Sequence, residues 1–148
     1  MKYDNGKYIA EQLSEFLAPL YFKHYFNADY ITFIPMTEKA ERKRGFNQGE
    51  LLAKATASRV GVPVLKCLKK VKDTERQANL GRAERLKNLS TAYRVATRKA
   101  IRDKSVLIID DVSTTGATVQ AAADKLKRAG AKRVYLLSVA SVPPIEKY

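Results

Sequence analysis

The sequence has one cysteine and one histidine, and each scarcity removes a class of site. With Cys67 as the single thiol, the chain cannot build an internal disulfide framework or a zinc site from several cysteines. With His24 as the single imidazole, a metal site built from histidines is excluded. We therefore expect Cys67 to be a small buried or half-exposed apolar residue, and His24 to lie at the surface.

Long apolar runs are also missing. No stretch reaches the roughly 18 apolar residues that a helix needs to span a bilayer, and residues 2–7 are too polar to begin a signal peptide. We therefore expect a soluble, cytoplasmic protein without a membrane span. Its 148 residues are an ordinary size for one domain, so we treat residues 1–148 as a single domain.

Positive charge, in contrast, is abundant. Lysine and arginine number 28 against 15 acidic residues, which gives a net charge of +13. The segment 66–104 holds thirteen basic and four acidic residues, so it alone supplies nine of these charges. Such a surplus favours a polyanionic partner such as single-stranded DNA, or else it serves solubility.

The stretch 105–118 combines a buried strand with a polar loop. Residues 106–109 are continuously apolar, which is typical of a strand buried on both faces of a parallel sheet. The run ends at Asp110 and Asp111, and after the loop apolar residues recur at helical spacing until Gly130. Ligands of open α/β sheets bind beyond the carboxyl ends of the strands, and helix N-termini attract anions. The sequence therefore predicts a phosphate site in this loop.

Small side chains suit that loop to a phosphate. They let the backbone curl closely round the anion, their hydroxyls donate hydrogen bonds, and Gly116 can adopt a positive φ. The residues predicted to hold the phosphate are Ser113, Thr114, Thr115, Gly116, Ala117 and Thr118. Asp110 and Asp111 would repel a phosphate, so we expect them to face a ribose diol, with Mg²⁺ nearby.

Other motifs explain the stretch less well. A P-loop needs lysine after its last glycine, but Ala117 follows Gly116, and the Gly-x-Gly-x-x-Gly dinucleotide fingerprint is absent. A phosphorelay receiver has its paired aspartates on the first strand and a further aspartate on a later one, whereas the later apolar run 134–142 contains no acid. A purely structural role, in which the two acids end a strand and cap a helix, stays open.

The remaining chain predicts further elements around this unit. An amphipathic helix is expected near the amino end, with a face formed by Ile9, Leu13, Phe16, Leu17 and Leu20 packed on the sheet. A strand at 31–35 should lead into a flexible, cationic loop at 39–47, and a helix should follow at 48–59. The polar segment 72–88 predicts a mobile lid, followed by a short strand at 92–96.

The residues at 106–118 also resemble a known signature. Four apolar residues, two acids, an apolar residue, any residue and Thr-Thr-Gly-x-Thr are similar to the phosphoribosyl-pyrophosphate (PRPP) motif of the type I phosphoribosyltransferases. Two upstream patterns resemble the ComF branch of that superfamily, the competence-associated proteins: Arg44-Gly-Phe-Asn-Gln48, and Gln77-x-x-Leu80 followed by Arg85-x-x-Asn88.

This resemblance covers nearly the whole chain and implies a fold. The expectation is a single α/β domain with a mainly parallel sheet flanked by helices, and a small hood with a flexible lid at 72–88. Longer ComF proteins carry an amino-terminal four-cysteine zinc module that is missing here. The sequence does not say whether this is a short family member or an excised domain, and a homodimer stays open.

The resemblance also implies roles for individual residues. The loop 113–118 would bind the 5′-phosphate of PRPP, and Asp110 and Asp111 would hold the ribose hydroxyls or water on Mg²⁺, the cofactor that comes with PRPP. Arg44, Gly45 and Asn47 would bind the pyrophosphate, and Arg44 joins the two acids as a catalytic residue. Lid residues would reach the ligand or a second substrate: Gln77, Arg82, Arg85 and Asn88. No metal site of the protein alone is implied.

Several functions fit these residues. The first is a ComF-type protein linked to DNA uptake that transfers or senses the phosphoribosyl group. The second is a non-catalytic protein that binds single-stranded DNA with PRPP as its regulator, and the third is a base phosphoribosyltransferase of nucleotide salvage. For the DNA-binding surface, we expect Lys69, Lys70 and Lys72 to lie on an exposed face, away from the phosphate loop.

Overall fold

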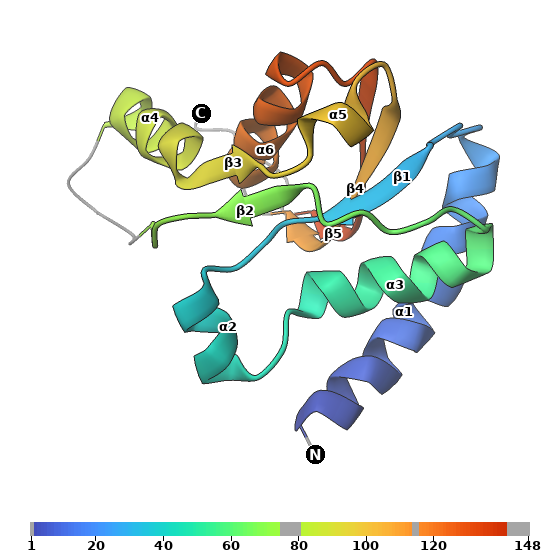
Figure 1. The fold of residues 1–148 in the computed structure, drawn as a ribbon. Helices are drawn as coiled ribbons and strands as arrows, with labels where there is room; N and C mark the ends of the chain where they lie inside the picture. The colour runs from blue at the N-terminus through green and yellow to red at the C-terminus, as the bar shows by residue number, and fades with distance from the viewer. Residues whose placement is uncertain (1, 75–80, 114–115, 142–148) are drawn as a thin grey trace, which may run out of the picture.

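A parallel sheet forms the centre of the computed structural model, which describes residues 2–74, 81–113 and 116–141 (Figure 1). Its three strands lie in the order β1 (Tyr30–Phe33), β4 (Ser105–Ser113) and β5 (Arg133–Ser141). Val64 adds a parallel bridge to Ile31 on the free side of β1. The predicted mainly parallel α/β fold is confirmed, and β4 occupies the middle of the sheet.

The central strand β4 is buried on both faces, as its sequence predicts. Residues 106–109 are all 0% exposed. Leu107 and Ile109 pack in one core with helices α1 (Lys2–Lys23) and α3 (Gln48–Val60), whereas Val106 and Ile108 pack in another with α5 (Arg98–Ile101) and α6 (Ala117–Arg128). Figure 1 shows α1 and α3 on one side of the sheet and α5 and α6 on the other. This double burial fixes the end of β4 firmly.

Helix α1 exists as predicted, and Leu13, Leu17 and Leu20 of its expected face pack in the core, whereas Ile9 and Phe16 do not. Ile9 is 49% and Phe16 70% exposed, while the buried stripe runs through small residues such as Gly6, Ala10 and Ser14. The reason is close packing against α3 and its lead-in: a Cβ added at Gly6 would lie 2.9 Å from a ring atom of Phe46. Small residues therefore share the buried face with Leu13, Leu17 and Leu20, and apolar spacing alone predicts this face only in part.

The predicted flexible loop at 39–47 is instead mostly a helix, α2 (Glu38–Arg44). Thr37 caps its start, because its Oγ1 accepts from the backbone N–H of Ala40 at 3.2 Å. Gly45 ends it with φ +92°, a conformation that glycine adopts at little cost. Asn47 then caps α3. The caps at Thr37 and Asn47 and the turn at Gly45 therefore order this cationic segment as helix α2 followed by the start of α3.

A small hood has its own two-stranded sheet and packs on the core beside the main sheet. It consists of the antiparallel pair β2 (Leu68–Lys70) and β3 (Tyr93–Val95), the described residues 71–74 that follow β2, and α4 (Arg82–Ala92). Helix α4 packs on α6, and Ala92 and Tyr93 are buried against Ala121. The segment predicted as a lid therefore contains the start of a helix from Arg82 onward. None of the described helices is long and apolar enough to cross a bilayer.

Candidate functional site

A cleft of about 290 Å³ lies where β1 and β4 end, and we call it the strand-end cleft. The ends of the two strands, the amino ends of three helices and the hood all contribute to it. It is lined by Ile34, Pro35, Met36, Thr37, Ala40, Arg44, Asn47, Gln48, Gly49, Lys70, Asp73, Tyr93, Asp110, Asp111 and Thr118. The cleft therefore lies where the topology of an open α/β sheet predicts a ligand.

The two acids that follow the buried part of β4 lie in this cleft and interact with each other. The backbone N–H of Asp111 donates to Oδ1 of Asp110 at 3.0 Å. Burial, followed by the side-chain hydrogen bond and the negative charge of Asp111, raises the pKa of Asp110 to about 7, although the backbone N–H of Asp111 acts in the opposite direction. Burial, and then the charge of Asp110, raise the pKa of Tyr93 to about 12. Below pH 7 the acid pair therefore retains a proton.

The predicted phosphate loop is described in part. Gly116 has φ +75° and begins α6 without a side-chain cap, and the first helical bond runs from the N–H of Gln120 to its carbonyl at 2.8 Å. Ala117 opens the helix and Thr118 lines the cleft. The backbone of Ser113 forms the end of β4, and Thr114 and Thr115 lie outside the described residues. The described part thus presents a helix N-terminus to the cleft.

The three residues predicted to bind pyrophosphate divide into two kinds. Arg44 lines the cleft with an exposed side chain, and its guanidinium carbon lies 5.3 Å from the ring centroid of Phe46. Asn47 is buried: its Oδ1 accepts from the N–H of Glu50 at 3.3 Å, and its Nδ2 donates to the carbonyl of Ile34 at 3.2 Å. Gly45 caps α2 and is not among the residues that line the cleft. Only Arg44 offers a charge to a ligand.

The residues predicted for the lid are not brought to the cleft in the described structure. Arg82 and Arg85 are exposed on α4, Asn88 is half-buried on the same helix, and none of the three lines the cleft. Gln77 lies outside the described residues. Their contact with a ligand stays a prediction.

The hood supplies three cleft residues that the sequence did not single out as ligand residues. Lys70 lines the cleft with its Nζ 5.8 Å from the ring centroid of Tyr93 and is half-buried, so the expectation that it lies on an exposed face is wrong. Asp73 accepts a hydrogen bond from Oγ1 of Thr37 at 2.7 Å, which ties the hood to the end of β1. Lys70 and Tyr93 meet through the β2–β3 register, a long-range pairing that leaves no periodic signal in the sequence.

Comparison with known proteins agrees with this geometry. Residues 47–144 match the phosphoribosyl transferase domain family. The chain is 34% identical over 107 residues to the DNA utilization protein YhgH of Salmonella typhi, covering 72% of this chain and 46% of that protein. It is 29% identical over 109 residues to competence protein F of Haemophilus influenzae, covering 72% and 48%. The chain thus spans about half the length of the curated relatives it matches.

Solved structures share the fold. The glutamine PRPP amidotransferase of B. subtilis superposes with a TM-score of 0.62 at 22% identity, covering 93% of this chain and 27% of that one. A purine phosphoribosyltransferase from Pyrococcus horikoshii gives 0.56 at 18% identity, covering 94% and 85%. The signature at 106–118, the cleft beside it and these similarities agree with one another: the chain belongs to the phosphoribosyl transferase domain family, in its competence-associated ComF branch.

Proposed function

We propose that the strand-end cleft binds PRPP with Mg²⁺, and that the chain transfers or senses the phosphoribosyl group in a process linked to DNA uptake. The observation that carries this proposal is that one cleft unites a helix N-terminus at Thr118, the acid pair and the cation of Arg44. These are the three kinds of group that a phosphate, a ribose diol and a pyrophosphate require.

Each part of the cleft would have a separate task. The 5′-phosphate would accept hydrogen bonds at the start of α6, where Gly116 leaves the helix without a side-chain cap. The ribose hydroxyls would donate to Asp110 and Asp111. Arg44 and Lys70 would face the pyrophosphate, whose negative charge grows as it leaves. Asn47 would act as a positioning residue, since its amide holds α3 against the end of β1.

The acids fit Mg²⁺ in a limited way. No group of three or more His, Cys, Asp or Glu side chains within the described ranges could hold a metal ion. Mg²⁺ commonly binds through one or two carboxylates plus waters and substrate phosphates, so Asp110 and Asp111 would hold it together with PRPP. When bound, the ion would neutralise charge on the pyrophosphate.

Calorimetric titration with PRPP and Mg²⁺ tests the proposal. We expect saturable binding of one PRPP per chain, weakened when Arg44 is replaced by Gln. Lys43→Gln serves as the matched control, because Lys43 is exposed on the same helix and does not line the cleft. Absence of PRPP binding by a folded wild type would refute the proposal, and pyrophosphate release on adding bases would separate a transferase from a sensor.

Single-stranded DNA is a second candidate partner, and a specific observation favours it. Among the described basic residues of 66–104, every one except the half-buried Lys70 is exposed. Lys69 and Arg94 are direct cross-strand partners in the hood, a like-charge arrangement that costs stability unless an anion compensates it. The relatives named for competence and DNA utilization agree with such a partner.

The DNA proposal predicts a salt-dependent affinity. The log-log slope should be roughly 0.7 per contacted phosphate for a single strand. Replacing Arg94, Arg98 and Lys99 by Gln should flatten the slope measured by anisotropy while PRPP affinity is unchanged, because none of the three lines the cleft. A wild type that does not bind DNA at low salt would leave the charge as a solubility feature and favour a salvage transferase.

A further inference from the structure

The hood holds one large polar side chain, Tyr93 of β3, almost wholly out of water. Tyr93 is 1% exposed and is the largest of the described side chains that are buried to this degree. Its hydroxyl makes no hydrogen bond with another described residue. A buried hydroxyl without a partner destabilises a fold, and buried polar groups are nearly always paired. The Tyr93 hydroxyl therefore lacks the partner that its burial requires.

The hydroxyl is the part of Tyr93 that reaches the strand-end cleft. Among the described residues, the side-chain polar atoms that are fully enclosed and unpaired belong to Thr32, Thr56 and Thr97. Tyr93 does not belong to this group, so its unpaired oxygen still touches open space, and the cavity that Tyr93 lines is the strand-end cleft. The missing partner can therefore come from a molecule bound in the cleft.

Packing brings Tyr93 to the acid pair. Ile34 follows the last paired residue of β1, so the parallel register places it beside Asp110 of β4. Ile34 packs against the small core cluster to which Tyr93 and Ala121 of α6 belong. Burial, and then the negative charge of Asp110, raise the pKa of Tyr93 to about 12, which agrees with this placement. The phenol is therefore protonated at neutral pH and can donate a hydrogen bond next to the acids.

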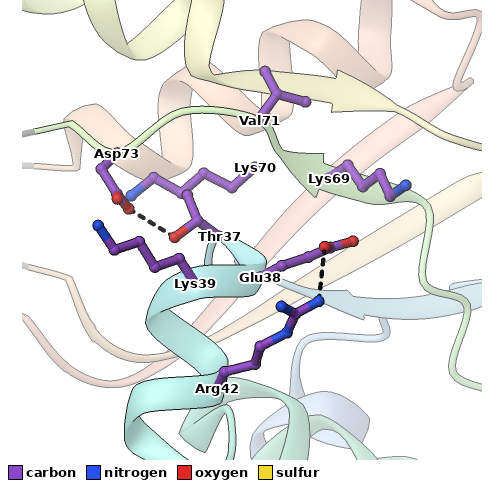
Figure 2. Close-up of a pocket in the computed structure, with 8 residues that line it drawn as sticks. All are labelled: Thr37, Glu38, Lys39, Arg42, Lys69, Lys70, Val71 and Asp73. Carbon is purple, nitrogen blue, oxygen red and sulfur yellow. Dashed lines mark hydrogen bonds and ion pairs between the residues drawn. The ribbon is translucent and has the colours of Figure 1, made fainter.

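The charged groups of the hood point elsewhere as well. A second cavity, of about 560 Å³, opens between α2 and β2, and we call it the hood groove (Figure 2). It is lined by Thr37, Glu38, Lys39, Arg42, Lys69, Lys70, Val71 and Asp73. Of the three described hood residues that line the strand-end cleft, Lys70 and Asp73 also line the groove, and Tyr93 does not. Tyr93 is thus the neutral hood residue that faces the cleft alone.

We propose that Tyr93 recognises the ribose of PRPP, by donating a hydrogen bond to the oxygen of a ribose hydroxyl that itself donates to Asp110. This inference rests on the proposed binding of PRPP in the cleft. A neutral donor suits this position, because Asp110 and Asp111 would repel a phosphate there. A sugar hydroxyl can accept from the phenol while it donates to the carboxylate, so both the phenol and the sugar oxygen obtain partners.

Tyr93→Phe tests the inference, because it removes the hydroxyl and keeps the ring. We would titrate the variant and the wild type with PRPP and Mg²⁺, with ribose 5-phosphate, and with pyrophosphate and Mg²⁺. The affinities for PRPP and ribose 5-phosphate should each fall about tenfold, and the affinity for pyrophosphate should not change. The thermal midpoint of the free protein should not fall, since the hydroxyl has no partner there.

Tyr21→Phe is the matched control. Tyr21 is also a buried tyrosine, but its hydroxyl accepts a hydrogen bond from the backbone N–H of Ala28 at 3.3 Å, and it lines neither cavity. Tyr21→Phe should therefore lower the thermal midpoint and leave PRPP affinity unchanged. The two variants separate a hydroxyl that holds the fold from one that binds a ligand.

A double-mutant cycle tests whether Tyr93 and Asp110 share one ribose hydroxyl. If they do, Tyr93→Phe should weaken PRPP binding only about twofold in the Asp110→Asn background, because the shared hydroxyl is already released. Additive losses would place the two residues on different ligand groups and would overturn the inference.

The remaining outcomes separate this inference from the proposed function. If the wild type does not bind PRPP, the proposed function fails first. If PRPP binds equally well to wild type and Tyr93→Phe, the inference is overturned and the PRPP site stands. An equal loss of pyrophosphate affinity in Tyr93→Phe would assign the hydroxyl to the pyrophosphate and would also overturn the inference.

Discussion

The end of β4 and the hood meet at one cleft, but the described residues of the two regions differ in how firmly they are packed. Residues 106–109 of β4 are fully buried, and the strand pairs with a neighbour on each side. In the hood, Leu68 of β2 and Tyr93 of β3 are buried, but α4 buries only Ala92 among its residues, and its Leu86 is 41% exposed. Local opening costs least where few apolar contacts hold the chain. The end of β4 is therefore the firm side of the cleft, and α4 is the adaptable part of the hood.

A hydrogen bond links the hood to the main sheet at the end of β1. Thr37 follows β1, caps α2 and donates to Asp73 of the hood at 2.7 Å. The hood is thus connected to the main sheet by a polar contact as well as by the packing of α4 on α6. Variants on the firm side should disturb ligand binding more than variants on the hood side.

The largest effect is expected at Gly116. Gly116→Val places a β-branched residue at φ +75°, which costs roughly 1–2 kcal/mol, and its side chain would obstruct the approach of a phosphate. Loss of two charge-assisted bonds of about 1.5 kcal/mol each should weaken PRPP binding by at least about 100-fold.

Gly61→Val is a matched control for this variant. Gly61 has φ +74°, ends α3, and like Gly116 has no atom within 4 Å of an added Cβ. It should cost similar stability in a thermal melt without altering PRPP affinity. Equal affinity loss in both variants would mean that Gly116 acts through folding alone.

The acid pair should come next. Asp110→Asn with Asp111→Asn replaces two charge-assisted bonds to the ribose by neutral ones, so PRPP affinity should fall about 30-fold, at about 1 kcal/mol per bond. Calorimetry with PRPP and Mg²⁺ measures this, and Asp103→Asn, an exposed acid outside the cleft, is the control. Unchanged affinity in the folded double variant would remove the acids from the site.

The third prediction concerns pH. Because the pKa of Asp110 is raised to about 7, the free protein binds a proton there that hydroxyl donors would displace. PRPP affinity should therefore rise between about pH 5 and 7, by up to tenfold per unit, and level off above. Asp110→Asn removes this contribution and leaves only the titration of PRPP itself. Titration in buffers of different ionisation enthalpy would detect the released proton.

The raised pKa of Asp110 also predicts that the stability of the fold falls as pH rises, which is the opposite of the trend in PRPP affinity. A carboxyl whose pKa is higher in the folded state stabilises the fold below its ordinary pKa near 4, and this contribution is lost as pH rises through about 7. Asp110→Asn should therefore gain stability relative to wild type mainly above pH 7, by on the order of 1 kcal/mol. Denaturant melts at pH 5 and pH 8 that show the same difference would contradict the shift.

The firm side of the cleft is the part that the sequence predicts well. A continuous apolar run can be satisfied only by burial on both faces, and the following acids, small loop and helix are contiguous in the chain. Residues 106–109, Asp110 and Thr118 therefore lie where local rules place them. The resemblance to the PRPP signature covers this same contiguous stretch.

The hood side depends on contacts between distant segments, which local patterns do not encode. Lys70 reaches the cleft because β2 pairs with β3, and Thr37 meets Asp73 across 36 residues. The many cations of segment 39–47 favour a loop, and this composition does not reveal that Thr37 and Gly45 cap a helix there. On α1 the prediction is wrong for Ile9 and Phe16, because close packing against α3 places small residues such as Gly6 in the buried face.

The last and smallest expected effect is that of Lys70→Gln, which tests the contribution of the hood side of the cleft to PRPP binding. Lys70→Gln removes a half-buried cation that lines the cleft beside Tyr93, so PRPP affinity should fall about fivefold, which corresponds to the loss of roughly 1 kcal/mol of charge-assisted bonding. Lys72→Gln, two residues further along, removes an exposed lysine that lines neither cavity and should leave PRPP affinity unchanged. Both variants lower the net charge equally, so an effect of overall charge would weaken binding to the same degree in each. A loss of PRPP affinity in Lys70→Gln alone would show that Lys70 acts from its position in the cleft. Equal losses in both variants would show that Lys70 contributes only through the overall positive charge.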